Sequence, residues 1–198
     1  MRVKICGLTR VLDAQRASDL GVDAIGLNFW PNSKRFITLE QGAKVARACA
    51  PLVWVVGVFV NAPRAEIERA IARVGLHAIQ LHGDELSADT RGYSVPVFKA
   101  IHLSKGTTPR IRFTTPLVLD AQQPGYGGGG VTLDWARARR VAREHQVLLA
   151  GGLTPKNVRQ AIEAVEPLGV DVASGVESSP GVKDQKLMAR FVRAVRSA

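Results

Sequence analysis

The sequence predicts a small α/β protein, a single-domain (β/α)8 TIM barrel spanning residues 1–198, and three observations lead to this fold class. Short apolar, β-branched runs recur eight times, each about as long as a buried strand. These runs are almost continuously hydrophobic, which is typical of parallel strands covered on both faces. Amphipathic stretches of helical spacing lie between most of them. No linker or change of composition divides the chain, so we expect one domain.

Strands and helices alternate along the chain. The expected strands are Arg2–Cys6, Ala24–Asn28, Val53–Phe59, Ala78–His82, Val97–Ala100, Pro116–Asp120, Val147–Ala150 and Asp171–Ala173. The expected helices are Leu12–Leu20, Leu39–Ala48, Ala62–Val74, Asp134–Glu144, Pro155–Glu166 and Gln185–Ala198. The segments Asp84–Gly92 and Leu103–Ile111 are short, so we expect one or both of the helices there to be vestigial.

Glycine and proline mark several expected helix ends. Gly21, Gly75 and Gly169 each begin a similar segment, in which glycine supplies the left-handed backbone that stops a helix before the next strand. Thr154 is the expected N-cap of the helix that starts at Pro155. A doubly wound open sheet is the alternative fold, but its glycine fingerprint is missing after the first strand.

Composition excludes several classes of protein. With 46% hydrophobic and 22% charged residues the chain is not disordered, and two cysteines are too few for a disulfide-stapled miniprotein. The longest apolar run, residues 52–60, is far shorter than the ~20 residues that span a bilayer. The opening MRVKICGLTR lacks the apolar core of a signal peptide. We therefore expect a cytoplasmic protein with no membrane partner.

A net charge of +10 requires either an acidic partner or a solvated surface. Nucleic acid and a phosphorylated or carboxylated metabolite are the candidate partners. The arginines are spread along the expected helices, and no dense block of like charges occurs. This pattern favours a solvated surface, and we expect no nucleic-acid partner.

Two residues at strand ends are the leading candidates for chemistry, because barrel active sites lie where the strands end. Cys6 ends the first expected strand, and its thiolate could act as a base or nucleophile. The alternative for Cys6 is a small buried apolar side chain. Asp120 ends the sixth strand, where an acid needs a polar pocket or partners. Its alternative role is to cap the following loop.

Glycine-rich segments follow three strands. Residues 123–132 contain five glycines, which suits either a lid over a ligand or a plain surface loop. Glycines also follow the seventh and eighth strands just before helix starts, where backbone N–H groups suit a phosphate cradle and ordinary turns are the alternative. The candidate cradle comprises Gly151, Gly152, Ser174 and Gly175.

Four polar residues complete the expected site. Arg35 could hold a carboxylate through a bidentate fork, or stack on a neighbouring aromatic ring at the surface. His82 ends the fourth strand, and Asp171 lies on the last strand. Lys99 could form a Schiff base, although a structural role is favoured. The histidines and cysteines lack metal-ligand spacing, so we expect no metal. Together these groups predict proton transfer on a phosphorylated, carboxylate-bearing small molecule.

The order of these residues resembles the phosphoribosylanthranilate isomerase family of tryptophan biosynthesis. The matching segments are KICGLT (4–9), GLNFWPNSKR (26–35), VFVN (58–61), IQLHGDE (79–85), LD (119–120), YGGGG (126–130), LAGGL (149–153) and VDVASGVE (170–177). The resemblance implies an Amadori rearrangement of N-(5′-phosphoribosyl)anthranilate to 1-(2-carboxyphenylamino)-1-deoxyribulose 5-phosphate, with no metal or organic cofactor. The sequence leaves open whether the chain is a monomer or a homodimer.

The resemblance also implies a role for each candidate residue. Asp120 matches the general acid that protonates the furanose ring oxygen, and Cys6 matches the general base that removes the C2′ proton. Asp120 must then hold a proton and Cys6 must lose one, which requires a raised and a lowered pKa respectively. Arg35 matches the residue that binds the anthranilate carboxylate. The remaining matches to the substrate site are His82, Asp171, Gly128, Gly129, Gly151, Gly152, Ser174 and Gly175.

Three positions depart from the family's pattern. Lys34 stands where proline is frequent, Gly129 where serine or threonine is common, and Ala173 where serine is frequent. None of these changes removes a proposed catalytic group. Three other functions stay open: an aldolase that uses Lys99, a basic nucleic-acid-binding protein, and a barrel without activity.

Overall fold

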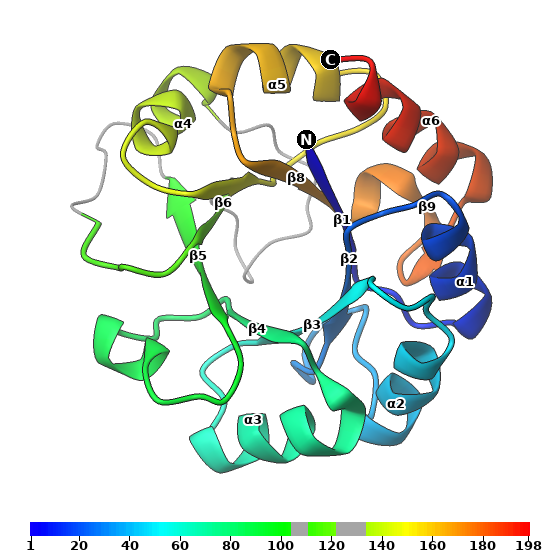
Figure 1. The fold of residues 1–198 in the computed structure, drawn as a ribbon, viewed down its shortest axis with the longest axis vertical. Coiled ribbons are helices and arrows are strands. Elements are labelled where there is room, and N and C mark those ends of the chain that lie inside the picture. The colour runs from blue at the N-terminus through cyan, green and yellow to red at the C-terminus, as the bar shows by residue number, and fades with distance from the viewer. Residues whose placement is uncertain (104–110, 122–133) are drawn as a thin grey trace.

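Eight parallel strands form a closed barrel in the computed structural model, and helices surround it (Figure 1). The structure describes residues 1–103, 111–121 and 134–198. The barrel strands are β1 (Arg2–Cys6), β2 (Ala24–Asn28), β3 (Trp54–Phe59), β4 (Ala78–Leu81), β5 (Val97–Leu103), β6 (Leu117–Ala121), β7 (Val147–Leu149) and β8 (Gly169–Val172). The α-helices are α1 (Val11–Asp19), α2 (Leu39–Arg47), α3 (Arg64–Ala70), α4 (Trp135–Ala142), α5 (Val158–Val165) and α6 (Gln185–Arg196).

Shorter elements fill some of the connections. They are the π-helix η1 (Ile71–Gly75), the 3-10 helices η2 (Ser87–Thr90) and η3 (Ser174–Val176), and an antiparallel hairpin of β9 (Glu177–Ser179) and β10 (Val182–Lys183). The expected short segment before β5 contains η2, a single 3-10 turn in place of an α-helix. Most of the other short segment, which follows β5, lies outside the described residues.

Each strand pairs with the next along the chain, and β8 closes the ring by pairing with β1. In the closing pair, Val3 lies opposite Val170 and Ile5 opposite Val172. The ring confirms the predicted barrel and excludes the open sheet, since an open sheet has two unpaired edges. No helix in the described part of the chain is long and apolar enough to cross a membrane.

Side chains alternate between the two faces of each strand, as the pleat of a strand requires. On β1, Val3 and Ile5 join the large apolar cluster between strands and helices. Lys4, between them, reaches across the barrel to Gln80 of β4 and Asp171 of β8. Cys6 lies two residues further along the same face and lines the pocket at the end of the barrel. The alternation therefore puts polar groups inside the barrel and its main core outside.

Two of the expected helices differ from the structure by more than two residues at one end. The helix α5 begins at Val158, because the side chain of Asn157 bonds back to the preceding loop at Thr154 N and Gly152 O. Thr154 is therefore part of a turn and not the N-cap. The expected helix over residues 62–74 divides into α3 and the π-helix η1.

Two of the three expected glycine caps are confirmed. Gly21 and Gly75 have φ of 68° and 75°, the left-handed backbone that ends a helix. Gly169 is not a cap: Glu166, with φ 54°, ends α5, and Gly169 is the first residue of β8. A Cβ at Gly169 would lie 2.7 Å from the carbonyl oxygen of Arg2, so glycine is needed there for the close approach of β1 and β8.

Candidate active site

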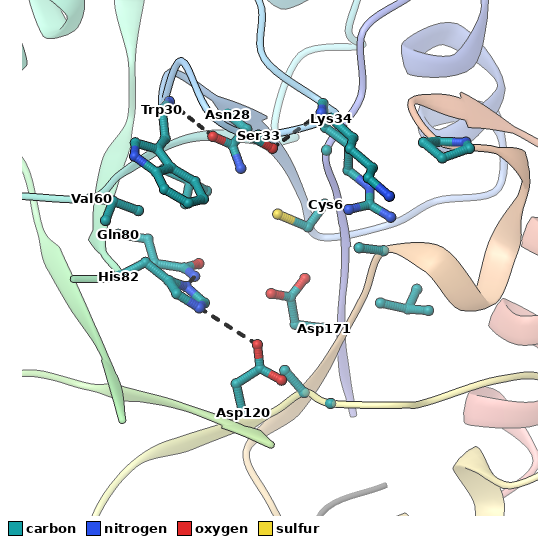
Figure 2. Close-up of a pocket in the computed structure, with 18 of the residues that line it drawn as sticks. Cys6, Asn28, Trp30, Ser33, Lys34, Val60, Gln80, His82, Asp120 and Asp171 are labelled. Carbon is teal, nitrogen blue, oxygen red and sulfur yellow. Dashed lines mark hydrogen bonds and ion pairs between the residues drawn. The ribbon is translucent and has the colours of Figure 1, made fainter. Parts of the chain in front are cut away.

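A pocket of about 340 Å³ opens at the carboxyl ends of the strands. It brings together five predicted residues from five parts of the chain: Cys6, Arg35, His82, Asp120 and Asp171. Figure 2 shows Cys6, His82, Asp120 and Asp171 around the pocket. Its volume is in the range of small-molecule sites. The predicted residues Gly151 and Gly152 also line the pocket. Ser174 and Gly175 follow the lining residue Ala173 but are not themselves in the lining, and Gly128 and Gly129 lie outside the described residues.

Cys6 and Asp120 enter the pocket from opposite sides, with Asp171 between them (Figure 2). Burial raises the pKa of the Cys6 thiol, and the nearby Lys4 ammonium only partly offsets this effect. The expected lowering of the Cys6 pKa is therefore wrong for this structure. Gly26 on β2 makes room for the thiol, because a Cβ there would lie 2.5 Å from Sγ.

Below the pocket, Lys4 is held between two polar side chains. Its Nζ lies 2.8 Å from Oδ2 of Asp171 and 3.0 Å from Oε1 of Gln80, and the lysine is only 3% exposed. Burial opposes its charge, but Asp171 and Cys6 outweigh burial and raise the pKa of Lys4. The other oxygen of Asp171, Oδ1, is buried and has no hydrogen-bond partner within the described residues. This oxygen is an acceptor available to a ligand.

His82 connects this polar group to Asp120. Its Nδ1 lies 2.7 Å from Nε2 of Gln80, and its Nε2 lies 3.5 Å from Oδ2 of Asp120. The ring of His102 lies edge-on to that of His82, with centroids 5.1 Å apart. Burial, followed by the neighbouring His82, lowers the pKa of His102.

Sequence reasoning placed His82 at the mouth of the barrel but missed His102. The strand β5 extends to Leu103, three residues beyond its expected end, and its register puts His102 opposite Asp120. The apolar residues on either side of His102 were the available signal for a longer strand. His82, His102 and Asp120 have ligand atoms within 4.8 Å of one another, the only such group among the described residues that could hold a metal ion.

Arg35 belongs to a buried ionic network with Glu177 and Lys183. Glu177 accepts hydrogen bonds from Arg35 Nε at 2.8 Å and Nη2 at 2.7 Å. Lys183 Nζ, fully buried, donates to Glu177 at 2.7 Å, to the carbonyl of Cys6 at 2.6 Å and to that of Ala173 at 3.1 Å. This network joins the ends of β1 and β8 to the loop after β2.

The charged groups in this network shift the pKa values of one another. Burial opposes ionisation of Glu177, but Arg35 and Lys183 outweigh burial and lower its pKa. Burial lowers the pKa of Lys183, and Glu177 partly offsets that effect. Glu177 raises the pKa of Arg35. Sequence reasoning gave neither Glu177 nor Lys183 a role, because no local motif marks them.

The glycines after β7 and β8 allow their two loops to touch. Gly151 and Gly152 have φ of 79° and 66°, which other residues rarely adopt. A Cβ at Gly175 would overlap the carbonyl oxygen of Leu153, so backbone meets backbone there. Both loops lie next to the pocket, as the predicted cradle requires.

Lys99 is held by protein groups outside the pocket. Its Nζ donates to the carbonyls of Gly83 at 2.7 Å and Ala100 at 3.1 Å, and it pairs with Glu85 at 3.0 Å. The side chain does not contribute to the pocket lining. A Schiff-base role for Lys99, and with it the aldolase alternative, has no support in this geometry.

Comparison with known proteins shows the family of this chain. A sequence-family model described as N-(5′-phosphoribosyl)anthranilate (PRA) isomerase matches residues 3–194. The chain belongs to this family. It is 48% identical to the N-(5′-phosphoribosyl)anthranilate isomerase of Myxococcus xanthus, covering 100% of this chain and 97% of the relative. It is 44% identical to that of Azotobacter vinelandii, covering 100% and 98%.

Solved structures of phosphoribosylanthranilate isomerases share this barrel. The enzyme from Thermus thermophilus superimposes with a TM-score of 0.91 at 36% identity, covering 100% of this chain and 99% of the other. The Thermotoga maritima enzyme gives 0.88 at 36% identity, covering 100% of both chains. A further phosphoribosylanthranilate isomerase, at 33% identity, TM-score 0.84 and full coverage of both chains, was solved in complex with reduced 1-(o-carboxyphenylamino)-1-deoxyribulose 5-phosphate.

Proposed function

We propose that this chain catalyses the family's reaction in tryptophan biosynthesis, the Amadori rearrangement of N-(5′-phosphoribosyl)anthranilate, with Asp120 as general acid and Cys6 as general base. The observation that carries the proposal is the placement of a carboxyl group and a thiol on opposite sides of one pocket. The reaction needs an acid at the ring oxygen and a base at C2′, and two opposed groups supply both without moving the sugar.

The first step opens the sugar ring. Asp120 donates a proton to the furanose oxygen, the C1′–O bond breaks with its electrons on that oxygen, and the nitrogen lone pair forms a C1′=N iminium ion. The Cys6 thiolate then takes the proton from C2′, and the C–H electrons form a C1′=C2′ bond while the iminium nitrogen becomes neutral. The resulting enolamine gains a proton at C1′ and loses one from the C2′ hydroxyl, which gives the ketone.

The raised pKa of Cys6 fits a base that is activated during the reaction. Burial favours the protonated thiol before a positively charged intermediate forms next to it. The iminium ion brings a positive charge next to it, and an adjacent cation favours the thiolate. Lys4 below the thiol acts in the same direction.

Arg35 would meet the anthranilate carboxylate with one amino group. The bidentate fork that sequence reasoning reserved for the substrate is occupied by Glu177, which takes Nε and Nη2. Nη1 is the remaining group of the guanidinium, and Arg35 lines the pocket. Glu177 thus holds the guanidinium in one orientation, which favours a preorganised contact.

The remaining predicted residues fit the rest of the substrate. The free Oδ1 of Asp171 is an acceptor for a sugar hydroxyl. Backbone N–H groups of the loops after β7 and β8 would bind the phosphate, with Gly151 and Gly152 on one side and Ser174 and Gly175 on the other. His82 also lines the pocket, and its Nε2 lies 3.5 Å from Oδ2 of Asp120.

Replacing the two catalytic groups tests the proposal. We expect Cys6→Ser and Asp120→Asn to lower kcat by roughly 10²- to 10⁴-fold, because neither a serine hydroxyl nor an amide can transfer these protons at neutral pH. The decay of substrate fluorescence, corrected for the spontaneous rate, measures turnover. Cys49→Ser is the matched control, since Cys49 is the other free cysteine and lies on the outside of the barrel wall. Wild-type turnover in both catalytic variants would refute the mechanism.

A further inference from the structure

The polar side chains inside the barrel form one continuous series of contacts that ends at Asp120. Asp171 holds Lys4, Lys4 donates to Gln80, Gln80 contacts His82, and His82 faces Asp120. Lys4, Gln80 and His82 are all at most 8% exposed, so water does not compete for these contacts. Some of these groups can only donate a hydrogen bond and others can accept one, so the donor and the acceptor of each contact follow from the chemistry of the side chains.

The orientation of Gln80 follows from Lys4. An ammonium group can only donate, so the Gln80 atom 3.0 Å from Lys4 Nζ must be its carbonyl oxygen. The amide nitrogen of Gln80 therefore lies at the other position, 2.7 Å from Nδ1 of His82. The amide nitrogen can only donate, so Nδ1 must accept. A neutral imidazole whose Nδ1 accepts carries its proton on Nε2.

The proton on Nε2 faces the proposed acid. Nε2 of His82 lies 3.5 Å from Oδ2 of Asp120, and the two groups point toward each other in Figure 2. Nε2 is buried and makes no hydrogen bond within the described residues at this separation. A movement of about half an ångström would form a hydrogen bond, and catalytic contacts commonly tighten when substrate binds.

We infer that His82 is a positioning residue for Asp120, donating Nε2–H to its carboxylate, and that Lys4 and Gln80 set the tautomer that makes this possible. The inference rests on the proposed function, in which Asp120 loses its proton as the sugar ring opens. The carboxylate then forms in a buried place, where an N–H donor stabilises it. Because the charge on Asp120 develops only during the reaction, the contact stabilises the transition state more than the bound substrate.

The same deduction counts against a metal ion at the group formed by His82, His102 and Asp120. A metal would need the lone pair of His82 Nε2, and in this arrangement that nitrogen carries a proton. Moving the proton to Nδ1 would set it against the amide group of Gln80, which Lys4 holds in place. The spacing of these three side chains suits a metal, but the hydrogen bonds behind them do not.

The tautomer can be measured directly. We expect ¹⁵N NMR of the histidine rings, with His82 assigned from the spectrum of His82→Gln, to show the proton of His82 on Nε2. In Gln80→Met, which removes the donor to Nδ1 at nearly constant shape, we expect a mixture of the two tautomers. A wild-type His82 with its proton on Nδ1, or an unchanged tautomer in Gln80→Met, overturns the inference. This readout does not depend on activity.

Two substitutions of His82 test its role. In His82→Gln the amide nitrogen replaces Nε2 as a donor, whereas His82→Leu has no donor. We expect His82→Leu to lower kcat by about 10- to 100-fold with KM within a few-fold of wild type, as for other lost supporting contacts, and His82→Gln to keep most of kcat. His145→Leu, outside the pocket, is the control and keeps wild-type kcat.

The outcomes separate this inference from the proposed function. Equal losses in His82→Leu and His82→Gln, or no loss in His82→Leu while Asp120→Asn is inactive, overturn the positioning role and leave the proposed function standing. Full activity in Asp120→Asn overturns the proposed acid, and with it the role of His82, whatever the NMR tautomer is.

Discussion

At the scale of single residues, the site depends on groups whose properties come from their neighbours. Burial raises the pKa of Cys6, and Glu177 occupies the fork of Arg35. Neither effect is visible in the local sequence of Cys6 or Arg35. Sequence reasoning predicted Cys6 and Arg35 as site residues, and both line the pocket, but it expected a lowered pKa for Cys6 and did not foresee that Glu177 occupies the fork of Arg35.

The buried thiol predicts a reactivity of Cys6 that rises with pH. Only the thiolate reacts with an alkylating reagent, and the pKa of Cys6 lies above the ordinary cysteine value of about 8.5. The thiolate is then the minor form near neutrality, and its fraction grows about tenfold per pH unit. We expect iodoacetamide to alkylate Cys6 in Cys49→Ser at a rate that increases between about pH 7 and about pH 9, measured by mass spectrometry. A rate that is flat over this range would contradict the raised pKa of Cys6.

Gly26 predicts a catalytic effect of a single methyl group. Alanine there would place Cβ 2.5 Å from Cys6 Sγ, so the thiol must turn away. We expect Gly26→Ala to lower kcat at least about tenfold, since a displacement of about 1 Å in an active site can cost far more. Gly75→Ala is the control: its φ of 75° strains alanine, but no atom lies within 4 Å of the new Cβ. It should lose stability and keep kcat, measured by thermal unfolding and steady-state kinetics. Equal kcat in the two variants would refute this account.

At the scale of elements, the hairpin β9–β10 acts as a brace for the site. It carries Glu177 at its start and Lys183 at its end, and together they hold Arg35 and the carbonyl of Cys6. The hydrogen bond from Lys183 to Cys6 joins residues 177 positions apart. No periodicity or short motif encodes a contact of that range, which is why the sequence could not reveal it.

The lowered pKa of Glu177 predicts that its contribution to the free energy of unfolding depends on pH. A carboxyl whose pKa is lowered in the folded state stabilises the fold fully above its unfolded pKa, about 4.3, and loses that contribution as pH falls through the folded value. We expect Glu177→Gln to lower the free energy of unfolding by roughly 3 kcal/mol at pH 7. Urea unfolding should show this difference shrinking below about pH 4.

The control for Glu177 is Glu163→Gln. Glu163 pairs with Arg159 at the surface, where both side chains are more than half exposed, so its loss should change stability little. A difference between wild type and Glu177→Gln that stays constant at low pH would show that the stabilisation does not come from ionised Glu177.

At the scale of the whole molecule, the barrel could be predicted because its signals are local and repeated. All eight strands lie within a few residues of the expected ranges, because a short continuous apolar run is a local sequence signal of a buried strand. Once the barrel is assumed, residues at strand ends must converge, and Cys6 and Asp120 do so. What sequence reasoning missed depends on register and side-chain reach: His102 is opposite Asp120 only because β5 runs on to Leu103.

Because β1 pairs with β8, the barrel cannot close during synthesis until β8 has been made. Arg2 pairs with Gly169, so β1 has no partner on one side until β8 has emerged from the ribosome. An unpaired strand edge invites contact with other chains. Cys6 lies on that strand, and Lys4 must wait for Asp171. Cys6 is therefore made before the other site residues and waits longest for the finished barrel to enclose it.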